Sequence, residues 1–226
     1  VYGETDGDQT IAMLGDSKMG QWFPAVEAIA KDEGWRLELY LKSACAFTYD
    51  GAKDDCEEFG KNANAHFDAE GAPDIALVSQ GAGSSPELRA GMTEAIKELR
   101  AKGTEVVVLA DSPRPQGQVY TCVEDNPEDY SACDFPAEGN GRKGRGSKPL
   151  GAAAEATDTP FVDLNQWICP PGETCPPVIG DSLVYRQGSH VTATYIRTLT
   201  PMLYRALAAE DLTAKNSSEI SVDDIP

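Results

Sequence analysis

The stretch TIAMLGDSKMGQW, residues 10–22, sets the pattern of the fold. Its apolar run TIAML predicts a short buried strand, and the Gly-Asp-Ser that follows predicts a tight turn. From Gln21 to Gly34 the apolar residues recur at helical spacing, and Gly34 is a natural stop for the helix. A strand, a turn and a helix in this order indicate the first unit of an α/β fold.

The same alternation of strands and helices continues along the chain. DIALVS (74–79) and EVVVLA (105–110) are almost wholly apolar, as expected for strands buried on both faces of a parallel sheet. Further strands are predicted at 35–41 and 161–164, and further helices at 53–67, from Ser84 to Gly103 and at 191–209, where Pro201 is expected to bend or divide the helix. We therefore predict an α/β fold with a five-stranded parallel sheet between two layers of helices. In such sheets ligands bind beyond the carboxyl ends of the strands.

The length of 226 residues fits one α/β domain. We expect a linker at 1–9, the domain at 10–209 and a disordered acidic tail at 210–226. The stretch 112–149 shows little periodicity, which is typical of functional or disordered loops. Part of it, 139–148, carries basic residues that could meet an anionic partner, although we favour a plain exposed loop: Arg142, Lys143, Arg145 and Lys148.

The net charge of −18 restricts the classes of partner. So acidic a protein is not expected to bind nucleic acid, because phosphate binding needs a basic surface. The sequence holds no apolar run of about 18 residues that would span a bilayer. It also opens without the basic and apolar segments of a signal peptide, so we expect either that a signal was removed or that the chain is a segment of something larger.

The cysteines fall into three close pairs: Cys45 and Cys56, Cys122 and Cys133, and Cys169 and Cys175. Many connectivities are possible, but this clustering favours pairing between nearest neighbours. A zinc site is the competing interpretation, and it fits poorly because there is no CxxC spacing and the histidines are only His66 and His190. Disulfides would place the domain in an oxidising compartment outside the cytoplasm.

Ser17 lies directly after the first predicted strand, where a helix is about to begin. Its hydroxyl would therefore stand at the carboxyl edge of the sheet, where the amides of the new helix favour negative charge. A helix-capping serine is the competing interpretation. His190 precedes the last predicted helix and falls at the same edge, where neutral imidazole could serve as the base that a serine nucleophile needs. We interpret His66, in the helix predicted at 53–67, as a surface histidine.

Two blocks near the ends of the chain carry a family resemblance. LGDSKMGQW (14–22) and YRQGSHVTATY (185–195) resemble the first and last blocks of SGNH or GDSL-type hydrolases. The similarity is closer to the SGNH domains fused behind the membrane acyltransferase-3 domain of bacterial cell-envelope O-acyltransferases. Three further stretches resemble that subgroup: KSAC (42–45), DLNQWICP (163–170) and the Thr-Cys of ETCPP (173–177).

The resemblance implies a flavodoxin-like three-layer fold, the SGNH hydrolase fold, with Ser17 as nucleophile and His190 as base. It implies that the domain transfers an acyl group such as acetyl to a cell-surface glycan or glycolipid, or removes one. It also implies a membrane acyltransferase domain before Val1 as partner and tether. That arrangement would hold the domain outside the cytoplasm, at the cell envelope.

The chain departs from the family pattern at the acid of the catalytic triad. This acid usually lies three residues before the histidine, and here that position is Gln187. A glutamine oxygen can accept the Nδ1 hydrogen, but it carries no charge to stabilise an imidazolium. We therefore expect a weak enzyme, a Ser-His dyad, or an acid from elsewhere. Asp181 and Asp163 are the nearest candidates in sequence, although both fit loop-capping roles equally well.

The residues of the family's oxyanion hole are also altered. The glycine expected after the second strand is replaced by Ser43 and Ala44, and no asparagine follows the third strand. Backbone N–H groups need no particular side chain, so those of Ser17, Ala44 or Gly81 could still bind an oxyanion. Lys18, next to the nucleophile, could attract an anionic group, but we favour a lysine that faces solvent.

Three functions remain open at this point, of which a soluble secreted lipase is the least favoured, because no large apolar patch or lid is evident in the sequence. The first is an acyltransferase or esterase that uses Ser17 and His190. The second is a catalytically degenerate module that binds a glycan acceptor for the membrane acyltransferase domain, a role that Gln187 and the missing asparagine favour. The sequence shows no dinucleotide fingerprint, phosphate loop or metal-ligand spacing, so no cofactor and no metal are expected.

Overall fold

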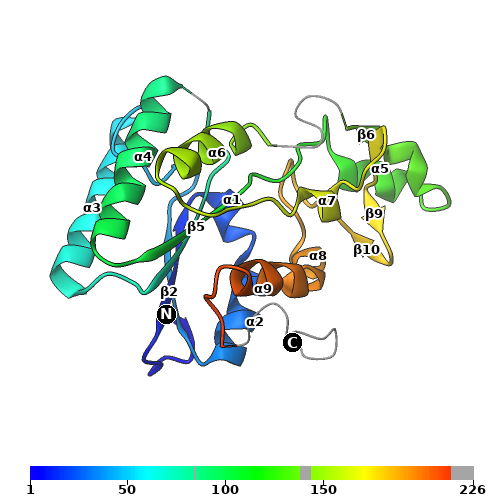
Figure 1. The fold of residues 1–226 in the computed structure, drawn as a ribbon. Coiled ribbons are helices and arrows are strands. Elements are labelled where there is room, and N and C mark those ends of the chain that lie inside the picture. The colour runs from blue at the N-terminus through cyan, green and yellow to red at the C-terminus, as the bar shows by residue number, and fades with distance from the viewer. Residues whose placement is uncertain (84, 138–143, 215–226) are drawn as a thin grey trace.

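The computed structural model describes residues 1–83, 85–137 and 144–214 (Figure 1). Its central sheet has the strand order β1-β3-β2-β4-β5-β7. The strands are β1 (Tyr2–Gly3), β2 (Thr10–Gly15), β3 (Arg36–Leu41), β4 (Ile75–Ser79), β5 (Glu105–Leu109) and β7 (Phe161–Val162). Strands β3, β2, β4, β5 and β7 run parallel, which confirms the predicted five-stranded parallel sheet. Counted along the chain, these five strands have the flavodoxin-like order 2-1-3-4-5.

The first residues of the chain differ from the expected linker. Tyr2 and Gly3 form β1, which pairs antiparallel with β3 and makes the sheet mixed. The ring of Tyr2 also meets Phe23 edge to face, with ring centroids 4.8 Å apart. The isolated sequence could not predict this strand, because an edge strand of two residues has no periodicity and gains its stability from the strand beside it.

Helices cover both faces of the sheet (Figure 1). The apolar strand residues alternate between two core clusters, so that Ile75 and Leu77 face one layer while Ala76 and Val78 face the other. The first layer holds α2 (Phe23–Glu33), α8 (Ala193–Thr198) and α9 (Thr200–Ala208); the second holds α3 (Asp54–Glu70), α4 (Pro86–Ala101) and α6 (Ser147–Ala156). This is a three-layer αβα arrangement, as predicted.

The predicted helix at 191–209 is divided, as Pro201 indicated. Helix α8 ends at Thr198, and Pro201 lies in the first turn of α9, where its missing N–H costs no hydrogen bond. The described part of the expected tail is ordered against the domain: Leu212 packs on the core, and the amide of Ala214 donates to Glu33. The rest of that predicted tail, 215–226, lies outside the described residues.

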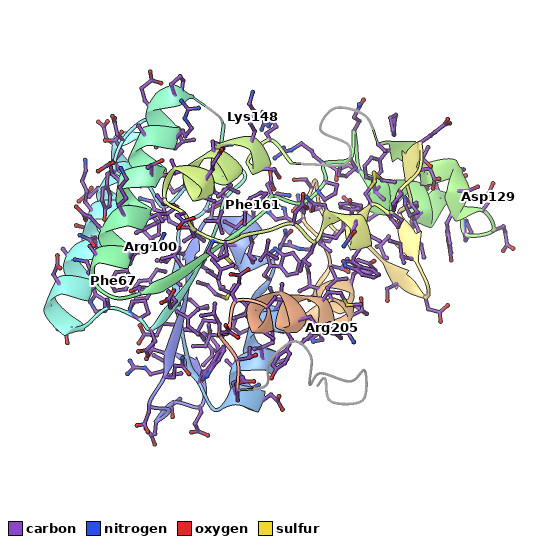
Figure 2. All side chains as sticks on the ribbon, viewed as in Figure 1. Phe67, Arg100, Asp129, Lys148, Phe161 and Arg205 are labelled. Atoms are coloured by element: carbon purple, nitrogen blue, oxygen red, sulfur yellow. A yellow bond between two sulfur atoms is a disulfide. The ribbon has the colours of Figure 1, made fainter. Side chains whose placement is uncertain are left out.

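The stretch 112–149 contains more structure than its weak periodicity indicated. It holds α5 (Val119–Asp125), the 3-10 turn η1 (Tyr130–Cys133), β6 (Phe135–Pro136) and the start of α6. A lobe lies on one side of the sheet domain (Figure 1). It is built from α5, η1 and β6 together with α7 (Asn165–Ile168), β8 (Thr174–Cys175), β9 (Val178–Ile179) and β10 (Ser182–Leu183). Figure 2 shows Asp129 at the outer end of this lobe and Phe67 at the opposite end of the molecule.

The three predicted disulfides are all formed, between nearest neighbours. Cys45–Cys56 links the loop after β3 to α3, whereas Cys122–Cys133 and Cys169–Cys175 lie in the lobe. Such bonds are stable in oxidising, extracytoplasmic compartments. Within the described ranges, no helix has both the length and the apolar character that crossing a bilayer requires.

Candidate active site

Ser17 and His190 are brought together although 173 residues separate them. Ser17 opens α1 (Ser17–Gly20) immediately after β2, and His190 stands shortly before α8. The Nε2 atom of His190 lies 2.8 Å from the Oγ atom of Ser17. The pair lies beyond the carboxyl end of β2, where the strand order of the sheet reverses, and this is the usual ligand site of such folds.

The other ring nitrogen of His190 is held by the backbone. Its Nδ1 atom lies 3.2 Å from the carbonyl oxygen of Gln187. A neutral imidazole that donates its Nδ1 hydrogen to this carbonyl leaves the Nε2 lone pair free to accept the hydroxyl hydrogen of Ser17. The side chain of Gln187 is exposed, so the position of the family acid acts here through its main chain rather than through the expected glutamine oxygen.

Neither aspartate considered as the triad acid is placed at the ring of His190. Asp163 accepts the amide hydrogen of Asn165, the first residue of α7, at 3.0 Å, a local contact that fits the loop-capping interpretation. Asp181 is exposed in the turn between β9 and β10. Burial lowers the pKa of His190, and the positive charges of nearby lysine and arginine side chains act in the same direction, whereas the hydrogen bond to the Gln187 carbonyl opposes them. These neighbours favour a neutral base at neutral pH.

The prediction that Lys18 faces solvent is wrong. Its side chain is only 3% exposed and forms an ion pair with Asp111, which is fully buried, at 3.2 Å. The Nζ atom also donates to the hydroxyl of Ser112 and to the carbonyl of Ser189, each at 2.6 Å. Burial lowers the pKa of Lys18, and Asp111 opposes that effect. A surface position would have left these buried acceptors without a partner.

This network holds the chain on both sides of His190. Lys18 binds the carbonyl of Ser189, and the side-chain oxygen of Gln21 accepts the amide hydrogen of Val191 at 3.0 Å. Gln21 also donates to Ser112, 3.1 Å away. The short helix α1 therefore carries the candidate nucleophile, and its residue Lys18 and its C-cap residue Gln21 hold the chain beside the candidate base.

The expected oxyanion donors have different environments. The amide of Gly81 donates to the Oδ2 atom of Asp16 at 2.9 Å, so it is already engaged and does not fit the expected role. In the described part of the chain, the amides of Ser17 and Ala44 have no hydrogen-bond acceptor. Ala44 has a φ of 58°, in the left-handed region that an alanine adopts at a cost, beside the Cys45–Cys56 disulfide. These two amides remain candidates for binding an oxyanion.

A pocket of about 430 Å³ opens over the pair and supplies room for a substrate. Its walls include Ser17, Ala44 and His190 together with two arginines, Arg114 and Arg145. Of the basic run at 139–148, Arg145 lines this pocket and Lys148 another hollow on α6, while Arg142 and Lys143 lie outside the described residues. His66 is exposed on α3, as predicted.

One cluster outside this pocket resembles a metal site in its spacing. The ligand atoms of Cys45, Asp55 and Cys56 lie close enough together to surround an ion. Both sulfur atoms form a disulfide, however, and therefore offer no thiolate to a metal. This cluster does not support metal binding.

Sequence reasoning missed two residues near the candidate site and placed a third, Lys18, in the wrong environment. The two missed residues, Asp111 and Arg114, follow β5. Lys18 is paired with Asp111 in the interior rather than exposed to solvent. A usable signal was present for Asp111, because it directly follows a buried strand at the carboxyl edge of the sheet. No sequence signal pairs Lys18 with Asp111, since they are 93 positions apart and only the sheet brings them together.

Replacing Gln187 with alanine is expected to leave kcat/KM for a small neutral ester within about twofold of the wild-type value, because the backbone carbonyl that orients His190 is retained. Hydrolysis of para-nitrophenyl acetate by both proteins checks this. A large loss with the fold intact would show that the glutamine side chain itself supports the base. His190→Ala, measured beside it, gives the size of the effect when the base is absent.

Comparisons with known proteins agree with this fold. The family model of the SGNH domain fused to AT3 domains matches residues 1–205. A crystal structure from Bacteroides fragilis, of a protein assigned as an acylhydrolase, superposes with a TM-score of 0.50 at 11% identity, covering 94% of this chain and 91% of that chain. No curated protein matches the sequence. Because the family model spans nearly the whole described chain, the chain belongs to the family of SGNH domains that are fused to AT3 domains.

Proposed function

We propose that this domain transfers an acyl group such as acetyl to, or removes it from, a cell-surface glycan or glycolipid, with Ser17 as nucleophile and His190 as base. The observation that carries this proposal is the 2.8 Å contact between Ser17 Oγ and His190 Nε2, with Nδ1 held by the carbonyl of Gln187. A serine becomes a useful nucleophile only when a base lies within hydrogen-bond reach and is itself oriented by a third group.

The reaction follows from these contacts. Ser17 Oγ attacks the acyl carbonyl carbon while His190 Nε2 takes the hydroxyl proton. The amides of Ser17 and Ala44 stabilise the oxyanion that forms. His190 then returns the proton to the departing oxygen, which leaves the acyl group on Ser17. An acceptor hydroxyl or water, deprotonated by the same histidine, attacks the acyl-enzyme and releases Ser17.

The environment of His190 favours the neutral ring, which can accept a proton, over the imidazolium that forms when it does so. Its lowered pKa keeps the ring neutral, and therefore able to accept a proton, at neutral pH. The imidazolium that forms during the reaction is supported by a carbonyl dipole rather than by a carboxylate charge. In serine proteases, replacing the aspartate of the triad with asparagine keeps the geometry and lowers kcat by about 10⁴. We therefore expect slow turnover by the isolated domain.

The proposed setting follows from the family and the disulfides. Domains of this family are fused to AT3 domains, so we propose that a membrane acyltransferase domain is the partner and the tether of this one. Three disulfides fit an extracytoplasmic position at the cell envelope. In this arrangement the membrane domain would supply the acyl group, and the SGNH domain would pass it to the acceptor.

Covalent labelling tests the proposed nucleophile. A serine-directed phosphonate is expected to add once to the wild-type domain, at Ser17, and not to Ser17→Ala, as measured by intact-protein and peptide mass spectrometry. His190→Ala should label much more slowly, because the hydroxyl then lacks its base. Absence of labelling at Ser17, or labelling that does not depend on His190, would contradict the catalytic role and favour a glycan-binding module.

A further inference from the structure

Two arginines border the pocket over Ser17 and His190. Arg114 comes from the loop after β5 and is half-buried, and Arg145 is exposed just before α6. In the described ranges, neither arginine forms an ion pair with a carboxylate. This is unexpected in a chain with a net charge of −18, where acidic partners are abundant.

The guanidinium of Arg114 is partly withdrawn from water without a partner. Its Nε atom is inaccessible to solvent and has no hydrogen-bond acceptor among the described residues. A buried donor left unpaired is unfavourable and rare, and at a functional site it commonly awaits a ligand. The positive charge of Arg114 also acts on the Ser17–His190 site, because it contributes to the lowered pKa of both Lys18 and His190.

The carboxylates nearby are committed elsewhere. Asp111 pairs with Lys18 and accepts the amide hydrogen of Gly146 at 3.1 Å. Asp16 accepts the amide hydrogens of Lys18 and Gly81, at 2.8 and 2.9 Å. Because both aspartates are engaged, neither neutralises the arginines in the pocket. The positive charges of Arg114 and Arg145 in the pocket wall are therefore available to a bound molecule.

We propose that Arg114 and Arg145 bind an anionic group, a carboxylate or a phosphate, carried by the substrate of Ser17. The inference rests on the proposed function and narrows its substrate class to acidic glycans or glycolipids, or to an acyl group with a second carboxylate. A guanidinium offers a planar fork of donors that matches both anions. A local positive patch is also what an acidic protein needs if it is to accept an anionic substrate.

The test uses two pairs of esters that differ by one carboxylate. Phenyl acetate and para-acetoxybenzoate place the difference on the leaving group, which stands for the acceptor side. Phenyl hexanoate and the monophenyl ester of adipic acid place it on the acyl group. The wild-type domain is compared with Arg114→Gln and Arg145→Gln, and with Arg197→Gln, an exposed arginine of α8, as matched control. Assays are run well above the ordinary histidine pKa of about 6.5, so that loss of a nearby charge does not alter the state of His190.

Arg114→Gln is expected to lower kcat/KM about tenfold or more for the anionic ester of one pair, and less than twofold for its neutral partner. Arg145→Gln should act in the same direction with a smaller factor, because its side chain is exposed. The pair that responds identifies whether the anion lies on the acyl group or on the acceptor. Equal losses for neutral and anionic esters, or no loss in either pair, would overturn the inference.

A binding measurement separates this inference from the proposed function. In the Ser17→Ala background, para-acetoxybenzoate and adipate monophenyl ester are titrated by calorimetry without being consumed. Weaker binding in Ser17→Ala/Arg114→Gln than in Ser17→Ala supports the anion site even if no ester is hydrolysed by the wild-type domain. If hydrolysis depends on Ser17 but neither arginine variant changes binding or kcat/KM, the proposed anion site is contradicted while the proposed function is supported.

Discussion

Replacing Ser17 with alanine is expected to lower kcat/KM for para-nitrophenyl acetate by about a thousandfold, to near the uncatalysed rate. Without Oγ there is no atom 2.8 Å from His190 Nε2 to attack the ester, and the acyl-enzyme cannot form. The fold should be unaffected, because the residue that caps α1 is Asp16 and not Ser17. Steady-state hydrolysis and a thermal melt of both proteins measure the two effects.

Ser131→Ala, which is remote from the candidate site, is the matched control for this experiment. Ser131 is an exposed serine in η1 of the lobe, and we expect its replacement to leave hydrolysis unchanged. Equal hydrolysis by the wild-type and Ser17→Ala proteins would show that the measured activity arises elsewhere on the protein. Labelling of Ser17 in the wild-type domain together with slow hydrolysis would instead show that the rate is limited after the acyl-enzyme has formed.

Replacing Lys18 with methionine is expected to lower the free energy of unfolding by about 3–5 kcal/mol, because it leaves Asp111 buried without its counter-ion. Methionine fills a similar volume but cannot donate to Ser112 or to the carbonyl of Ser189. Chemical denaturation of the wild-type and variant proteins measures the difference. This is the largest stability effect that we expect from a single charged residue of the described structure.

A double variant and a surface control test whether the loss of stability in Lys18→Met comes from the unpaired charge of Asp111. Lys18→Met/Asp111→Asn removes both charges and should recover much of the loss, since asparagine can still accept from Gly146. Lys31→Met breaks an exposed pair with Glu27 on α2, and should cost less than about 1 kcal/mol. Similar losses for Lys18→Met and Lys31→Met would contradict the buried ion pair.

The same variant should also move the pH dependence of catalysis. The charge of Lys18 lowers the pKa of His190, so its removal raises that pKa toward the ordinary value. Since the neutral ring is the active base, kcat/KM falls as pH drops through this pKa. In Lys18→Met the acid limb of the profile should therefore lie at higher pH than in the wild type, measured where both proteins are folded. An unchanged limb would limit Lys18 to a purely structural role.

Much of the fold follows from local sequence. Apolar runs such as DIALVS and EVVVLA, and helices with regular apolar spacing, report their own burial because the pattern and the contact partner lie in the same element. The disulfides were predictable for a similar reason, as each joins cysteines that are close in the chain. Strand β1 and the elements of the lobe were not, because they are too short for a pattern and are stabilised by neighbours and cross-links.

The same distinction between local sequence and distant contacts applies to the candidate site. The sequence by itself determined which residues are the candidates for the chemistry, since Ser17 and His190 stand in recognisable blocks, one at the end of a strand and the other before a helix. Only the tertiary structure decided how they are supported: the carbonyl of Gln187 in place of a side-chain acid, and Lys18 buried on Asp111 instead of facing water. The physical reason is that the partner of a buried polar group is chosen by the packing of distant segments, and local sequence holds no record of which segments will meet.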